Sequence, residues 1–205
     1  MIKNILFDFD GVILDSMKIK GDGFIELFKD YPHNSVKILE AYHYDNGGIS
    51  RFAKIHYFFN EILRTNISEK EIEKLAKRFA QIIAKKLFDK VNLIDETMMF
   101  IQHHYQHYCC HIVSGAEDNE LQNLCSHLGI AHYFISIEGS PTIKSLLVSN
   151  LLGRHNYLPH ETLLIGDSLN DYDAASANSI SFCGYNNPIL RPYGNYLETF
   201  IGFNP

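Results

Sequence analysis

The segment ILFDFDGVILD at residues 5–15 constrains the fold more than any other part of the chain. The mainly apolar residues 2–7 are typical of a short buried strand, and Asp8, Asp10 and the turn residue Gly11 follow directly. Carboxylates are costly to bury, so a strand that ends in two of them predicts an edge where they do chemistry. Taken alone, the two aspartates are equally compatible with an Asx turn that ends the strand.

The pattern changes to helices after this first strand. Residues 68–71, SEKE, form a capping-box sequence in which Ser68 and Glu71 can satisfy free amides at a helix start. The apolar residues that follow share one helical face: Ile72, Leu75, Phe79, Ile82, Ile83 and Leu87. The sequence DNGGIS at residues 45–50 is a turn between two other helical stretches. Helices are therefore expected throughout residues 16–88.

Strands and helices alternate beyond residue 90. We expect helices at residues 97–106, 118–128, 143–154 and 170–178, and strands at 109–114, 132–139, 162–167 and 179–185. Such alternation indicates a parallel sheet covered by helices on both faces. The predicted fold class is therefore α/β, a doubly wound parallel sheet. The catalytic core comprises residues 1–15 and 90–205, and an α-helical cap is inserted at residues 16–89.

Polar residues gather at the predicted carboxyl ends of the strands, where ligands bind in sheets of this kind. They are Asp8, Asp10, Ser114, Gly115, Asp167 and Asp171, with Lys144 near the start of a helix. Each has an ordinary alternative: Asp167 and Asp171 as helix-cap residues, Ser114-Gly115 as a turn, and Lys144 as a solvated side chain. Several carboxylates at one site repel one another unless a cation offsets them, which favours a bound Mg²⁺.

The ordered set of motifs resembles the haloacid dehalogenase superfamily, in its phosphatase branch with a helical cap after the first motif. The matching elements are DFDGVILDS (residues 8–16), VSG (113–115), Lys144 in SPTIK, and GDSLND (166–171). They occur in family order and cover essentially the whole chain. The branch includes members like phosphoglycolate phosphatase and β-phosphoglucomutase, so the resemblance implies a phosphoric monoester hydrolase acting on a small phosphorylated metabolite.

The resemblance also implies roles for the motif residues. Asp8 is the expected nucleophile, forming an aspartyl-phosphate, and Asp10 the expected acid and base, because residues i and i+2 of an extended chain point the same way. The expected Mg²⁺ ligands are Asp8, the main-chain carbonyl of Asp10 and Asp167, with Asp171 as a ligand or a support. Ser114 and the amide of Gly115 are expected to hold phosphoryl oxygens. Lys144 is expected to bridge nucleophile and phosphate.

Asp10 and Gly166 separate activities within this family. Dehalogenases resemble the pattern but lack the second aspartate, since an alkyl halide needs no proton on its leaving group. Sugar-phosphate mutases tend to carry an acidic residue where this chain has Gly166, so hydrolysis is favoured over the mutase alternative. A third alternative, a non-catalytic binding or regulatory member of the fold, is disfavoured by the intact Asp10 and Lys144.

Arg51 in the cap sequence GGISR has two interpretations. The sequence resembles a cap loop of β-phosphoglucomutase-like members, in which an arginine contacts the distal phosphate of the substrate. A guanidinium suits a second phosphate or a carboxylate, which it binds bidentately. Arg51 is equally compatible with the start of an amphipathic helix, where its side chain would be solvated.

Composition narrows the cellular setting. The chain is 46% hydrophobic with a net charge of −6, which supports a packed core and argues against nucleic-acid or membrane partners. Its four cysteines lack metal or disulfide spacing, and no apolar run approaches the roughly 20 residues of a membrane span. We therefore expect a cytoplasmic protein. The histidines of residues 103–111 straddle a helix-to-strand transition, so we interpret them as surface or core residues. The sequence does not indicate an oligomeric state.

Overall fold

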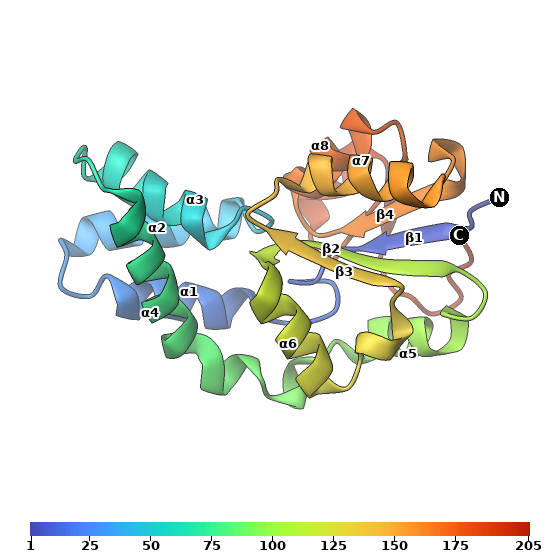
Figure 1. Ribbon diagram of the computed structural model, residues 1–205, viewed down its shortest axis with the longest axis horizontal. Helices are drawn as coiled ribbons and strands as arrows, with labels where there is room; N and C mark the ends of the chain where they lie inside the picture. Colours follow the sequence, from blue (N-terminus) through green and yellow to red (C-terminus); the bar gives the residue numbers. More distant parts are fainter.

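A computed structural model describes all residues, 1–205, and its centre is a six-stranded parallel sheet (Figure 1). The strand order is β3-β2-β1-β4-β5-β6, and every neighbouring pair is parallel. The strands are β1 (Asn4–Phe7), β2 (Cys109–Glu117), β3 (Ser136–Ser140), β4 (Thr162–Gly166), β5 (Ser181–Tyr185) and β6 (Asn195–Leu197). The first strand therefore lies in the middle of the sheet, which explains its burial.

Helices cover both faces of the sheet, as a doubly wound fold requires (Figure 1). The helices α5 (Asp95–His104) and α6 (Asp118–Leu128) lie on one face, and α7 (Lys144–His155) and α8 (Leu169–Ala177) lie on the other. Side chains of β1 alternate between the two cores: Ile5 and Phe7 join the core beneath α5 and α6, while Leu6 joins the core beneath α7 and α8. This confirms the predicted fold class.

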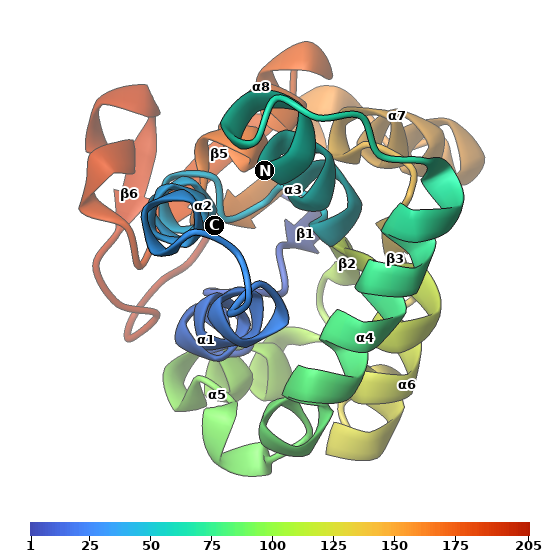
Figure 2. The ribbon, with the colours of Figure 1, turned by 90° about the vertical axis from the view of Figure 1, so that its left-hand side faces the viewer.

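A group of helices is inserted between β1 and β2, beyond the carboxyl edge of the sheet (Figure 2). It contains α1 (Met17–Leu27), α2 (His33–Asp45), α3 (Arg51–Tyr57), a π-helical turn (Phe58–Ile62) and α4 (Glu69–Leu87). The predicted capping box begins α4: Ser68 Oγ accepts from the Glu71 amide at 3.3 Å, and Glu71 accepts from the Ser68 amide at 3.1 Å. Aromatic rings fill the interior, with Phe28 and Phe58 stacked at 4.1 Å. The segment inserted between β1 and β2 is therefore helical.

The two chain segments that join the cap to the core run side by side. Leu14 and Leu93 form an antiparallel bridge. The amide of Ile94 donates to the carbonyl of Ile13 at 2.9 Å, and the amide of Asp15 donates to that of Asn92 at 2.7 Å. We call these two adjacent segments, residues 13–15 and 92–94, the hinge segments.

The structure differs from the sequence predictions at three strands. β2 continues past Ser114 to Glu117, because a register shift after Val113 lets it pair again with β3. β3 begins only at Ser136, since Ala131–Tyr133 form a 3-10 turn. The edge strand β6 was not predicted, because three residues are too few for a recognisable alternation. Elsewhere, 3-10 turns occur at Lys90–Asn92, Pro159–Glu161 and Pro188–Tyr193. Each helix is too short or too polar to cross a membrane.

Candidate active site

The candidate site lies where the carboxyl edge of the sheet faces the cap. The adjacent strands β2, β1 and β4 end near Ser114, Asp8 and Asp167, so parallel pairing brings these side chains to one place. Lys144 comes from the first turn of α7 and Asp171 from the first turn of α8. The fold thus gathers five of the sequence-predicted residues at the sheet edge, all of them buried.

Three carboxylates and one ammonium form the centre of this site. One carboxylate oxygen each from Asp8, Asp167 and Asp171 lies within 4.8 Å of the others. Lys144 Nζ lies 2.9 Å from Asp8 Oδ1 and also donates to Asp171 Oδ1. The other oxygen of Asp171 accepts from the amide of Ser168 at 3.0 Å and from its hydroxyl at 2.6 Å. Both carboxylate oxygens of Asp171 therefore have hydrogen-bond partners, whereas Asp8 Oδ2 and Asp167 Oδ1 are buried without a protein partner.

The charge of this cluster is unbalanced toward the negative. Burial and the neighbouring Asp171 raise the pKa of Asp8 to about 7, although Lys144 opposes them. Burial and Asp8 also raise the pKa of Asp167 well above its usual value. Unpartnered carboxylate oxygens with such pKa shifts are the donors that a hard divalent cation prefers. The residues present therefore fit a Mg²⁺ ion, with Asp8 and Asp167 offering the free oxygens.

Two glycines make room for the acids. Gly11 has a φ of +76°, and a Cβ there would overlap the carboxylate of Asp167. A Cβ on Gly166 would overlap the side chain of Asp171. The motif glycines are thus required by close approach of the aspartates, and Gly11 also by its left-handed backbone.

Asp10 has different partners from Asp8, because it faces the hinge and the cap. Its two oxygens accept from the hydroxyl of Ser16 and the ammonium of Lys20 on α1. Burial acts to raise the pKa of Asp10, but Lys20 and Ser16 together hold it below its usual value. Phe9, between the two aspartates, is buried in the core. Asp10 is therefore ionised in this arrangement.

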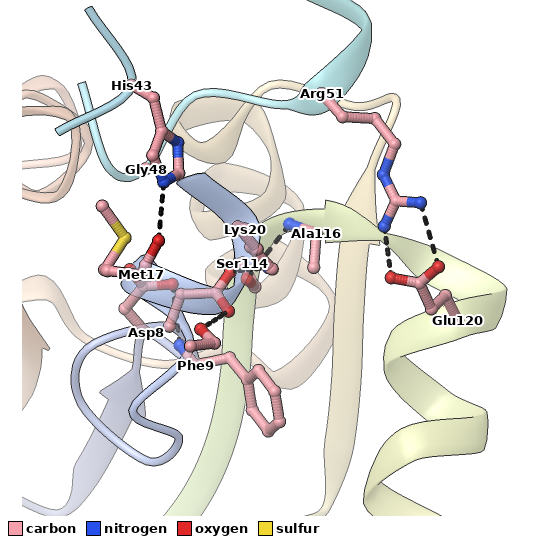
Figure 3. Close-up of polar contacts among 12 residues, drawn as sticks. Asp8, Phe9, Met17, Lys20, His43, Gly48, Arg51, Ser114, Ala116 and Glu120 are labelled. Carbon is pink, nitrogen blue, oxygen red and sulfur yellow. Dashed lines mark hydrogen bonds and ion pairs between the residues drawn. The ribbon is translucent and has the colours of Figure 1, made fainter. Parts of the chain in front are cut away.

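Ser114 and Gly115 lie on the register-shifted part of β2. The amide of Ala116 donates to Ser114 Oγ at 3.2 Å, which leaves the serine hydroxyl hydrogen free to donate (Figure 3). Gly115 touches the cap: a Cβ there would overlap the carbonyl oxygen of Gly48. That same oxygen accepts from Asn170 Nδ2 at 2.9 Å. The cap loop is thus seated directly on two core motifs.

Arg51 forms an ion pair between cap and core. Its guanidinium donates to both carboxylate oxygens of Glu120 on α6, one at 2.9 Å, and its centre lies 5.2 Å from the Phe79 ring (Figure 3). Arg51 as a whole residue is 8% exposed, so the interpretation as a solvated residue is wrong. The sequence could not reveal this pair because 69 residues separate its members.

Three further polar residues of the cap line the site, and sequence reasoning missed them: Lys20, His43 and Lys54. They share a cavity of about 20 Å³ with Asp10 and Gly115. Such a volume holds about one water molecule, so this arrangement of cap and core leaves no room there for a larger ligand. Each residue looks like an ordinary helical residue in the sequence, and no local pattern marks it.

Buried carboxylates beside a lysine, at the carboxyl edge of a doubly wound parallel sheet, are typical of the active site of an α/β enzyme. The chain belongs to the haloacid dehalogenase-like hydrolase family, whose sequence model matches residues 5–185.

Curated relatives and solved structures agree with this membership. Phosphoglycolate phosphatase from Vibrio vulnificus strain YJ016 is 28% identical over 207 residues, covering 90% of this chain and 86% of the relative. The structure of β-phosphoglucomutase from Clostridium difficile aligns with a TM-score of 0.77 and 18% identity. The alignment covers 100% of this chain and 94% of the β-phosphoglucomutase chain. The structure of CbbY from Rhodobacter sphaeroides in complex with xylulose-(1,5)bisphosphate aligns with a TM-score of 0.77 and 15% identity. The alignment covers 98% of this chain and 95% of the CbbY chain. The structural neighbours share the fold, and the family with its phosphatase relatives confirms the predicted phosphoric monoester hydrolase.

Proposed function

We propose that this protein is a Mg²⁺-dependent phosphatase that hydrolyses a small phosphorylated metabolite through an aspartyl-phosphate on Asp8. The observation that carries the proposal is the state of Asp8. Its Oδ1 is held by Lys144 at 2.9 Å, while its Oδ2 is buried and has no protein partner. Lys144 thus fixes the orientation of the nucleophile, while the unpartnered oxygen remains available to a metal ion.

Asp8 and Asp167 would hold the metal ion, with the Asp10 carbonyl as a third protein ligand and Asp171 as support through Lys144. When bound, the ion supplies positive charge that offsets the carboxylates and the substrate phosphate. Ser114 has a free hydroxyl hydrogen, and with the Gly115 amide it would hold phosphoryl oxygens.

The chemistry proceeds in two displacements. An oxygen of Asp8 attacks phosphorus, and the bond from phosphorus to the leaving oxygen breaks as that oxygen takes a proton from Asp10. Water then attacks the phosphorus, gives its proton to Asp10, and the bond between phosphorus and Asp8 breaks. Asp10 must first release Lys20 and gain a proton. Because Lys20 belongs to α1 of the cap, movement of the cap about the paired hinge segments would change this contact.

We propose residues 16–89 as the moving cap and residues 1–15 and 90–205 as the core that carries the chemistry. Gly166 supports hydrolysis over the mutase alternative. An acidic side chain at that position could not coexist with Asp171, because even a Cβ on Gly166 would overlap the Asp171 side chain.

The test is release of inorganic phosphate from p-nitrophenyl phosphate and from a panel of phosphorylated metabolites, with Mg²⁺ present. We expect turnover by the wild type and none by Asp8→Asn. Turnover that needs a bisphosphate activator would indicate a mutase. A folded wild-type protein that releases no phosphate from any compound would indicate a binding member of the fold.

A further inference from the structure

The cap presents four basic side chains to one small cavity, and the charges there do not balance. Lys20, His43, Arg51 and Lys54 all line it. Lys20 is neutralised by Asp10 on the core. Arg51 is neutralised by Glu120. Lys54 forms no ion pair with any carboxylate, although it is 2% exposed.

Lys54 is held in place by a neutral histidine. His43 Nε2 lies 2.9 Å from the carbonyl of Met17, to which it must donate, so Nδ1 is the free acceptor of the ring (Figure 3). Lys54 Nζ lies 2.9 Å from that Nδ1 and 3.5 Å from the carbonyl oxygen of His43. An ammonium carries three N–H donors, so these two contacts leave one N–H group without an acceptor.

A buried ammonium without an anionic partner is costly, and proteins seldom keep one without a use. Burial and the nearby Lys20 lower the pKa of Lys54 to about 7. Both the free donor and the unbalanced charge would be satisfied by an anion that enters the cavity.

We infer that Lys54 is the cationic centre of a subsite for an oxyanion, a carboxylate or a second phosphate, carried by the leaving group of the substrate. This rests on the proposed phosphatase function and deepens it. The position of the cavity indicates that it receives the leaving group of the substrate. It is bounded by Asp10, the proposed proton donor to the leaving oxygen, and by Gly115. His43 is a positioning residue, which directs the ammonium through its Nδ1.

The experiment compares matched substrates in single variants. We measure kcat/KM for phosphoglycolate against ethyl phosphate, and for xylulose-(1,5)bisphosphate against xylulose 5-phosphate. The first pair detects a carboxylate and the second a second phosphate. Each ratio is taken within one protein sample, so a partly unfolded variant does not distort it.

Lys54→Met should lower at least one of the two ratios about 10- to 100-fold, the usual effect of losing a charged hydrogen bond. His43→Leu should lower the same ratio by a smaller factor. The control Lys37→Met removes an exposed lysine of α2 and should leave both ratios unchanged. If Lys54 merely balances the core carboxylates, Lys54→Met will slow all substrates equally, and unchanged ratios overturn the subsite.

A binding measurement separates this inference from the proposed function. Calorimetry with the Asp8→Asn protein and Mg²⁺ measures the affinity for phosphoglycolate and for the bisphosphate without any turnover. Lys54→Met in that background should weaken binding of at least one of them about 10-fold or more. If the wild type proves inactive but this loss is seen, the function fails and the subsite stands. Equal affinities for both ligands with and without Lys54 overturn the subsite, whatever the activity.

Discussion

The carbonyl of Gly48 in the cap rests on Gly115 in the core so closely that a Cβ on Gly115 would overlap its oxygen and lie 3.0 Å from its carbon. Gly115 is therefore needed for the cap to seat, in addition to any role of its amide at the phosphate.

Gly115→Ala should hold the cap away from the core and lower kcat/KM for p-nitrophenyl phosphate by about 10-fold to 10²-fold, because small displacements at an active site are costly. Steady-state kinetics measure this. Gly153→Ala is the matched control, since nothing lies within 4 Å of a Cβ at that helical position. Equal activity of the two variants would show that the cap tolerates the extra methyl group.

Asp10→Asn should lower kcat/KM for an alkyl phosphate by about 10²–10⁴, the range for loss of general acid catalysis. The loss should be much smaller for 2,4-dinitrophenyl phosphate, whose leaving group departs without a proton. The control is Asp22→Asn, which alters a partly exposed aspartate of α1 that is paired with Lys18. An equal loss of kcat/KM on both substrates would show that Asp10 does not protonate the leaving group.

Asp167→Asn should raise the thermal stability of the metal-free protein, because it removes one of the charges that repel in the buried cluster. Mg²⁺ should stabilise the wild type, by about 2.7 kcal/mol at 100 times its Kd, but not this variant. Thermal unfolding with Mg²⁺ and with excess chelator measures both effects. The exposed Asp173 on the same helix provides the control variant Asp173→Asn. An Asp167→Asn protein that Mg²⁺ stabilises like the wild type would exclude Asp167 as a ligand.

Arg51→Gln and Glu120→Gln should lower kcat/KM for the best substrate of the panel by similar factors, on the order of 10-fold, since each breaks the same ion pair between cap and core. The double variant should be no worse than either single variant, because the pair acts as one unit. A double-mutant cycle on kcat/KM measures the coupling. Should Arg51 instead bind a distal phosphate directly, Arg51→Gln would raise KM while Glu120→Gln would leave KM unchanged.

Stability should fall in mild acid through His111, which is buried between Ser136 and Tyr157. Burial lowers its pKa from 6.5 to about 4. Between these values the unfolded chain binds a proton that the folded protein does not, so stability decreases as pH falls from 6.5 to 4. The decrease from pH 7 to pH 5 due to this group should be about 2 kcal/mol.

Urea denaturation of wild type and His111→Gln at the two pH values measures this contribution. The variant should lose about 2 kcal/mol less than the wild type on acidification. Its control is His33→Gln, which alters an exposed side chain at the start of α2 and should behave as the wild type. An unchanged acid sensitivity of His111→Gln would mean that His111 is protonated in the folded protein.

The sheet, the helical insertion and the set of acids at the sheet edge could all be predicted from the order of the amino acids. Local rules suffice for these features. Side chains of β1 alternate between two cores, and parallel strands must end at a common edge, so Asp8, Ser114 and Asp167 meet wherever such a sheet forms. Lys144 begins α7 as expected.

The way in which the cap meets this edge could be seen only in the folded protein. The contacts of Gly48 with Gly115 and of Arg51 with Glu120 join segments that are far apart in the chain. In the sequence Lys54 looks like a solvated helical residue, but in the structure α2 places His43 beside its ammonium group. No local pattern records these contacts, because they depend on the orientation between two separately packed parts. That orientation follows from the shapes of both surfaces together.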